Sequence, residues 1–287
     1  MKQVIFSAIA LLAGGLAASA AEVWAPGVSQ EGGWYDYHKT GSNDGVMADT
    51  AMCWAASASN VISWWQNLNI SRITSTVPQN EEIFDTFRGI YTNGGGKAYY
   101  AYEWWVNGNW SAPSGSGWAG IDKGMPQKYT SYANGGFLSK VYDTSLYPIT
   151  IATSSNNPYS YSEAVVNALS SGYALTLSVE NSGVAHAYTL WGAEYEITSK
   201  GYELTAVWLT NSDDIDNAPD LFRKDVICTY VEKGGVGTGS VAFDENMGAT
   251  FTQVAGLRSA PIVIPEPASA VLSIAAMLGL AARRRRR

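Results

Sequence analysis

The chain has 287 residues, of which 46% are hydrophobic, and its formal net charge is −7 at pH 7. This length allows one sizeable core or two small ones. The 29 glycines, 11 tryptophans and 17 tyrosines are typical of a loop-rich α+β or β protein and argue against a helical bundle. The acidic balance excludes a general affinity for nucleic acid, which requires basic surface.

Residues 1–20 have the features of a secretory signal peptide. Lys2 precedes an apolar run from Val4 to Leu16, and Ala18-Ser19-Ala20 supplies the small residues of a cleavage site. The apolar run is short for a membrane-spanning helix. We therefore expect export and removal of this segment, which then takes no part in the fold.

The segment from Asp49 to Trp65 predicts a helix with Cys53 in its first turn. Asp49 or Thr50 can cap the helix start. Cys53 lies near the positive end of the helix dipole, where a thiolate is favoured over a thiol, and the thiolate is the nucleophile. The apolar residues recur at steps of three and four on one helical face: Trp54, Ala58, Val61, Trp65 and Leu68.

Three further segments precede the polar strands. Residues 81–91 have helical apolar spacing, and a glycine run ends this predicted helix. Residues 99–118 are rich in Tyr and Trp, and they predict either a hairpin packed over the core or an exposed aromatic platform for a ligand. Residues 135–147 predict a strand between turns.

The second half of the chain predicts one helix and a series of strands. Ser160 and Glu163 form a capping-box pattern, and Gly172 ends that helix. The predicted strands cover residues 173–179, 185–191, a hairpin over 195–210, 221–231 and 239–243. Helices followed by antiparallel strands predict an α+β fold, in which the N-terminal helix packs on a twisted antiparallel sheet.

The chain has two cysteines, Cys53 and Cys228. In an oxidising compartment they can form a disulfide. Alternatively, Cys53 is a free nucleophile and Cys228 is buried in a strand. The two cysteines and two histidines show no metal-ligand spacing, so we expect no metal and no organic cofactor.

A thiol nucleophile requires a base, and histidine serves best near neutral pH. Of the two histidines, His186 begins an apolar strand. Asn211 and Asp213 end the next long strand, where they can orient the imidazole. A lone strand histidine is more often structural, but the order Cys, His, Asn/Asp favours a catalytic set.

These residues resemble two peptidase groups. Cys53-Trp54-Ala55-Ala56-Ser57 is similar to the start of the nucleophile helix in papain-like peptidases. A closer resemblance is to the bacterial immunoglobulin-degrading cysteine endopeptidases of the Mac/Ide type. The residues that carry it are Trp34-Tyr35-Asp36-Tyr37-His38-Lys39, Cys53 to Trp64-Trp65, His186 to Glu194, and Asn211-Ser212-Asp213.

The resemblance implies a papain-like fold and a role for each matched residue. Cys53 is the nucleophile, His186 the base and acid, Asn211 the orienting member, Asp213 a supporting acid, and Lys39 a stabiliser of the oxyanion. Asn211 replaces the family's Asp, as Asn does in papain-like enzymes. The loop between Lys39 and Cys53 is longer than in the family. The region before His186 differs throughout, so immunoglobulin specificity does not transfer.

The C-terminal segment, residues 263–287, combines Pro265-Glu266-Pro267, an apolar run and Arg283–Arg287. The cationic end is typical of a stop-transfer arrangement. This order resembles the PEP-CTERM sorting signal, which implies cleavage near Pro265 by an exosortase-type membrane enzyme. An ordinary C-terminal anchor is the alternative. Six of the 18 basic residues lie in the two terminal segments, so the domain between them is more acidic still.

The leading expectation is a secreted cysteine endopeptidase with its catalytic domain at residues 22–262. It acts on protein substrates at the cell surface or outside the cell, with transient membrane anchoring through residues 263–287. The alternative is a non-catalytic surface or matrix protein that binds polysaccharide through residues 99–118. A third reading keeps the catalytic residues but cleaves a cell-wall peptide or an isopeptide.

Overall fold

The computed structural model describes residues 20–43, 45, 47–73, 76–108, 131–132, 134–143, 149–213, 220–233, 236–244 and 248–259. The predicted sorting segment and all but the last residue of the predicted signal peptide lie outside these ranges. Among the described residues, no helix combines the length and apolarity that a bilayer crossing requires.

Most helices come first along the chain and most strands follow them. The helices are α1 (Cys53–Leu68), the 3-10 turn η1 (Ile70–Arg72), α2 (Glu81–Ile90), α3 (Ala98–Asn107) and α5 (Pro158–Ser170). The strands are β1 (Ala21–Trp24), β2 (Thr150–Thr153), β3 (Tyr173–Asn181), β4 (Val184–Thr198), β5 (Gly201–Thr210), β6 (Phe222–Lys233), β7 (Val236–Phe243) and β8 (Thr250–Arg258).

The strands close into an antiparallel barrel. The pairing order β4-β3-β8-β7-β6-β5 returns to β4 through the β4–β5 hairpin, while β1 and β2 add to the outside of this ring on β4 and β8. Closure pairs each strand of the ring with a neighbour on both sides, although β7 and β8 pair at a single position, Ala242 with Thr250. The predicted α+β papain-like fold, with the nucleophile helix on a twisted antiparallel sheet, is therefore wrong.

Two strands explain why the sequence did not predict the closure. The segments expected as separate strands around residues 185–198 are one strand, β4, which pairs with β3 along its first half and with β5 along its second. The strand β8 was not predicted, yet it joins β3 to β7. Strand patterns in a sequence indicate which face is buried, not which strand is the neighbour.

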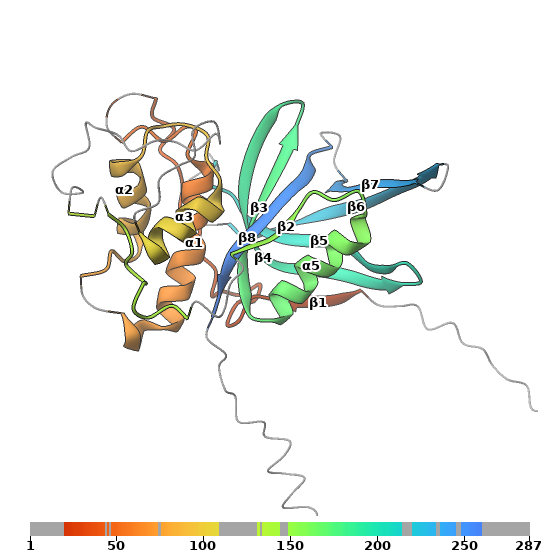
Figure 1. Ribbon diagram of the computed structural model, residues 1–287, viewed down its shortest axis with the longest axis horizontal. Coiled ribbons are helices and arrows are strands. Elements are labelled where there is room, and N and C mark those ends of the chain that lie inside the picture. The colour runs from red at the N-terminus through yellow and green to blue at the C-terminus, as the bar shows by residue number, and fades with distance from the viewer. Residues whose placement is uncertain are drawn as a thin grey trace, which may run out of the picture.

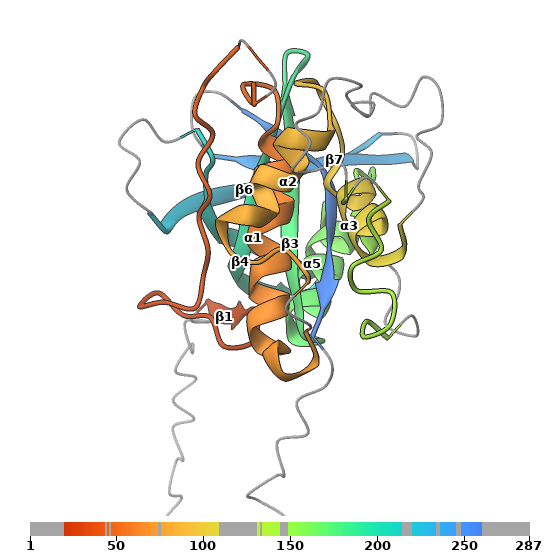
Figure 2. The same cartoon turned by 90° about the vertical axis from the view of Figure 1, so that its left-hand side faces the viewer.

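Helix α1 lies against the outside of the barrel. It contacts β3, β4 and β8, and α2 and α3 cover it from the other side (Figures 1 and 2). Every residue from Trp54 to Gln66 is buried, which confirms the predicted helix. The indole N–H groups of Trp54, Trp64 and Trp65 each donate to a backbone carbonyl, at 2.9–3.0 Å. These bonds let three large side chains be buried without unpaired donors.

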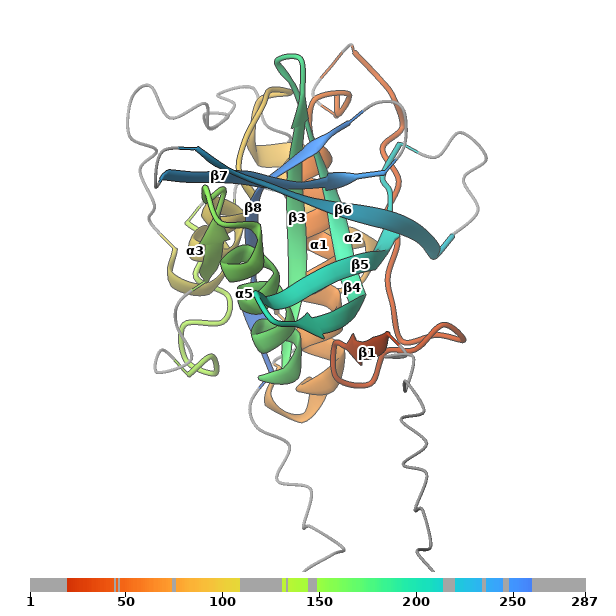
Figure 3. The same cartoon turned by 90° about the vertical axis from the view of Figure 1, so that its right-hand side faces the viewer.

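Helix α5 lies on the side of the barrel away from α1 (Figures 1 and 3), where it contacts β1 to β7. Its N-cap is Asn157, whose side chain accepts bonds from the N–H groups of Tyr159 and Ser160. The predicted capping box at Ser160 is therefore wrong, because Pro158 already begins the helix.

Two predictions for the middle of the chain are wrong. Residues 98–107 form helix α3 instead of a hairpin, and its Trp104 and Trp105 are buried in the core. The described part of residues 135–147 forms turns, from which Leu138 and Tyr142 enter the core. The remainder of the aromatic segment, residues 109–118, lies outside the described residues.

Candidate active site

Cys53 is the first residue of α1, and its thiol is half-buried. The N-cap is Met52, which makes no side-chain capping bond, so the predicted caps Asp49 and Thr50 are wrong. At the first helical position, the Cys53 N–H needs no partner within the helix. Cys53 therefore presents both a thiol and a backbone donor at the positive end of α1.

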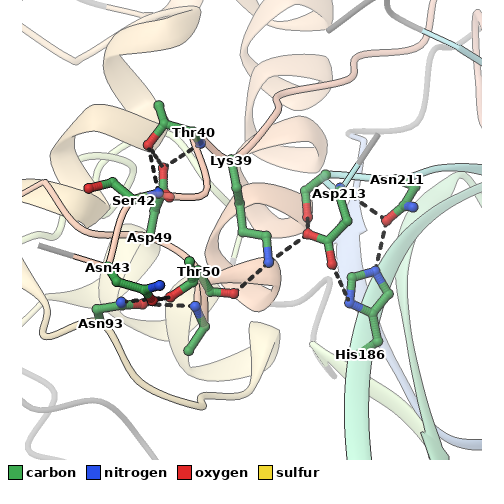
Figure 4. Close-up of polar contacts among 12 residues, drawn as sticks. Lys39, Thr40, Ser42, Asn43, Asp49, Thr50, Asn93, His186, Asn211 and Asp213 are labelled. Atoms are coloured by element: carbon green, nitrogen blue, oxygen red, sulfur yellow. Dashed lines mark hydrogen bonds and ion pairs between the residues drawn. The ribbon is translucent and has the colours of Figure 1, made fainter. Parts of the chain in front are cut away.

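Asp49 and Thr50 instead hold the loop before the helix (Figure 4). The buried Asp49 carboxylate accepts the Thr40 N–H at 2.8 Å and the Thr40 hydroxyl at 3.0 Å, and it pairs with Arg88 at 3.1 Å. The Thr50 carbonyl accepts a bond from Lys39 Nζ at 2.6 Å. The long loop from residue 40 to residue 52 is thus fastened at both ends beside Cys53.

His186 lies near the start of β4, and Asn211 directly follows the last residue of β5. The pairing of Thr189 with Thr210 brings the two side chains together. His186 Nε2 lies 2.8 Å from Asn211 Oδ1. Because an amide oxygen only accepts, Nε2 carries the proton in this bond. Nδ1 is then the nitrogen that can exchange a proton with a thiol.

Asp213 and Lys39 complete the cluster. Asp213 Oδ2 lies 3.6 Å from His186 Nδ1, and Asp213 Oδ1 lies 2.5 Å from Lys39 Nζ. The Lys39 side chain is only 8% exposed, whereas that of Asp213 is 44% exposed. A bond from the Lys39 N–H to the Ser212 carbonyl, at 2.8 Å, joins the two segments directly.

The protonation of Cys53 and His186 is mutually favourable. Burial raises the pKa of Cys53, but the hydrogen bond and charge of His186, then the charge of Lys39 and the Ala187 N–H, lower it below its ordinary value overall. Burial lowers the pKa of His186, but Cys53, Asn211 and Asp213 raise it overall. Both directions favour a thiolate–imidazolium pair.

A buried polar network fixes α1 relative to β4. The Asn60 amide accepts the Tyr37 N–H at 2.8 Å and donates to Thr189 Oγ1 at 2.9 Å. Ser57, one turn after Cys53, is 3.1 Å from both Thr189 Oγ1 and Thr176 Oγ1. Asn60 thus connects the helix of Cys53 to the segments that carry Lys39 and His186.

The structure brings together all five residues predicted for the site. Lys39, Cys53, His186, Asn211 and Asp213 line one cleft of about 800 Å³. Sequence reasoning missed the buried Asn60, whose only signal is a polar residue inside an apolar helical stretch. The other histidine, His38, lies 3.6 Å from Asp36 and does not line the cleft.

The two cysteines are both free. Cys53 interacts with His186, whereas Cys228 on β6 lies 3.5 Å from the Ser162 hydroxyl of α5. Within the part of the chain that the structure describes, no three His, Cys, Asp or Glu side chains cluster in a way that could hold a metal ion.

Comparison with known proteins places the chain in a family. The chain is 28% identical over 212 residues to a protein named IgM protease from Streptococcus suis (strain P1/7). The match covers 63% of this chain and 18% of the relative, so the chain spans less than a fifth of that protein's length. The family model described as Mac 1 matches residues 18–92 and 76–250. The resemblance seen in the sequence is confirmed at this level, and the chain belongs to the Mac 1 family.

Proposed function

We propose that this protein is a cysteine endopeptidase in which Cys53 is the nucleophile and His186 the general base and acid. The observation that carries the proposal is the contact of His186 with Cys53 on one side and with Asn211 on the other, at 2.8 Å. This is the arrangement that nucleophilic catalysis requires: a nucleophile, a base and a group that orients the base.

In the proposed reaction, the Cys53 thiolate attacks the peptide carbonyl carbon, and the carbonyl oxygen becomes an oxyanion. The Cys53 N–H and Lys39 Nζ are the donors for this charge. Two of the three Lys39 ammonium protons are engaged, by Thr50 and Asp213, so one remains for the oxyanion.

The second half of the reaction uses the same imidazole. His186 gives its Nδ1 proton to the leaving amine as the C–N bond breaks, which leaves a thioester on Cys53. His186 then takes a proton from water, which attacks the thioester and releases the acid. Asn211 keeps the ring in one orientation throughout.

Three substitutions test the mechanism on an unfolded protein substrate. Cys53→Ala and His186→Ala should lower kcat/KM by on the order of 10³-fold or more, since the nucleophile and its base act as a unit. Cys228→Ala is the matched control and should retain wild-type activity. Full activity in Cys53→Ala would exclude the mechanism.

The substrate is proposed to be a protein. The relative's name, IgM protease, makes immunoglobulin M one substrate to test, with cleavage followed by electrophoresis.

We also propose that the protein is exported and acts outside the cell, and that an exosortase-type enzyme processes residues 263–287. Mass spectrometry of the secreted form, with a new C-terminus near Pro265, tests the processing.

The described residues argue against polysaccharide binding by the aromatic segment. Trp104 and Trp105 lie in the core, packed against Phe87 and Phe137, rather than on a surface. Aromatic side chains must be exposed to stack on a sugar, and these two are at most 1% exposed.

A further inference from the structure

The cleft continues from Cys53 over the outer faces of β3, β8 and β2. Ser178 lies two residues after Thr176, so it faces the same side of β3 as the bond from Thr176 to α1. We call this surface the polar floor, and it comprises Thr153, Ser154, Ser178, Thr252 and Gln253, all of which line the cleft.

A β-bulge builds the polar floor. Ser178 pairs with Gln253, but the next residue, Val179, pairs with Phe251, so Thr252 is an extra residue in β8. Consecutive residues of a regular strand point to opposite faces. Here Thr252 and Gln253 both line the cleft, because a bulge re-aims one side chain.

The bulge is held by its own hydrogen bonds. Thr252 Oγ1 donates to the Ser178 carbonyl at 3.1 Å, and the Ser154 N–H donates to the Thr252 carbonyl at 2.6 Å. Among the described residues, neither the Ser178 hydroxyl nor the Gln253 amide has a hydrogen-bond partner. Both groups are half-buried and line the cleft, so they are placed to bond a ligand.

We infer that the polar floor is a substrate subsite for an uncharged, hydrogen-bonding side chain, such as Ser, Thr, Asn or Gln, close to the scissile bond. This inference rests on the proposed peptidase function and names the side-chain class that its cleft selects. The floor carries hydroxyl and amide groups but no charge. Charged residues line other parts of the cleft: the exposed Glu180 and Lys97 at its rim, and Lys39 and Asp213 of the candidate active site.

The physical basis of the selection is the cost of unpaired polar groups. An apolar substrate side chain would cover Ser178 and Gln253 without bonding them, which leaves buried donors and acceptors unsatisfied. A charged side chain would lose hydration without meeting an opposite charge on the floor. A polar, neutral side chain pairs with both groups, as in sites that reject analogues lacking a hydroxyl or amide.

The test is cleavage-site profiling of the purified protein on a proteome-derived peptide mixture. We expect enrichment of Ser, Thr, Asn or Gln at one position near the cleaved bond. Gln253→Leu should shift the ratio of kcat/KM values for matched peptides with Gln or Leu at that position about tenfold toward Leu. Ser178→Ala should shift this ratio of kcat/KM values in the same direction. Because Ser178→Ala removes only one oxygen atom, the variant should keep the fold. Thr238→Val, on the distant β6–β7 ribbon, is the matched control and should leave the ratio unchanged.

The outcomes separate this inference from the proposed function. Cleavage without a polar preference, or with a preference for apolar side chains, overturns the subsite and leaves the peptidase intact. A preference for Lys or Arg that Glu180→Gln abolishes also overturns it, because the rim carboxylate would then select the substrate. Absence of Cys53-dependent cleavage of any peptide overturns the peptidase function and the subsite together.

Discussion

The two parts of the cleft differ in how their polar groups are used. On the side of Cys53 and His186, the polar groups are paired with each other: Asn211 holds the imidazole, and Asp213 and Thr50 hold Lys39. On the polar floor, Ser178 and Gln253 have no partner within the described chain. Under the proposed function, the first part is organised in advance for chemistry on the peptide bond, and the second is completed by the substrate. Rate and specificity should therefore respond to different substitutions.

The largest effect in this comparison is expected at Lys39. Lys39→Met removes an oxyanion donor and the positive charge that helps to lower the pKa of Cys53. We expect kcat to fall by on the order of 10²–10³-fold, as when other oxyanion donors are removed. Steady-state kinetics on a matched peptide pair should show both peptides slowed equally.

Lys97→Met is the matched control, because Lys97 is an exposed lysine at the rim of the same cleft. It should change kcat by no more than a few-fold. Equal losses in the two variants would show that Lys39 acts only through the general charge of the cleft, and would remove it from the catalytic part.

The pH dependence is the next test. The pKa of Cys53 is lowered and that of His186 is raised, and both directions favour the proposed thiolate–imidazolium pair. As the pH falls through the lowered pKa, Cys53 gains a proton, and as it rises through the raised pKa, His186 loses one. The dependence of activity on pH should therefore be bell-shaped. The rate at which iodoacetamide alkylates Cys53 should fall about tenfold for each pH unit below the lowered pKa of Cys53, and should be nearly constant above it.

Cys228 is the internal control for this experiment. Burial raises the pKa of Cys228. In the Cys53→Ala variant Cys228 is the remaining thiol, and it should react slowly at neutral pH. Burial has the largest effect on the pKa of His186, followed by Cys53, Asn211 and Asp213. Asp213→Asn removes the last of these, a negative charge that raises the pKa of His186. The alkaline limb should then move to lower pH. Identical reactivity of the two thiols at pH 6 would contradict the ion pair.

The sequence predicted which residues would lie together in the cleft better than it predicted the fold that carries them. Cys53 and His186 were found because cysteine and histidine are scarce in this chain, and Asn211 and Asp213 because they follow a recognisable strand. Such signals are local. The ring closure, in contrast, depends on β4 pairing along both edges and on β8, whose alternation is interrupted by the bulge at Thr252.

The same limit explains two features that the sequence did not reveal, the role of Asn60 and the helix α3. Asn60 is identifiable as a connector only once β4 and the segment of Tyr37 are known to face α1. The Tyr- and Trp-rich segment that contains α3 was predicted as a hairpin or an exposed platform, but burial of Trp104 and Trp105 in the core stabilises a helix instead. Tertiary packing decides both cases.

A smaller effect, on stability, is expected from Asn60. Asn60→Ala leaves the Tyr37 N–H without its acceptor inside the core, where Asn60 is 1% exposed. The free energy of unfolding should fall by about 1–3 kcal/mol. Urea denaturation measures this, and Asn167→Ala, at an exposed position of α5, should change it by less than about 0.5 kcal/mol. A loss no greater than in the control would mean that the Asn60 bonds are replaced by water.

The smallest stability effect is expected on the polar floor, and it is the sharpest test of the contrast. Gln253→Leu removes an amide that bonds nothing among the described residues, so the folded chain loses no hydrogen bond. The side chain is half-buried, and leucine has a similar size. The free energy of unfolding should therefore change by less than about 0.5 kcal/mol, even though the preference between Gln and Leu peptides changes about tenfold. If Gln253→Leu instead destabilised the fold as much as Asn60→Ala, Gln253 would have a structural partner, and the floor would be part of the scaffold and not of the substrate site.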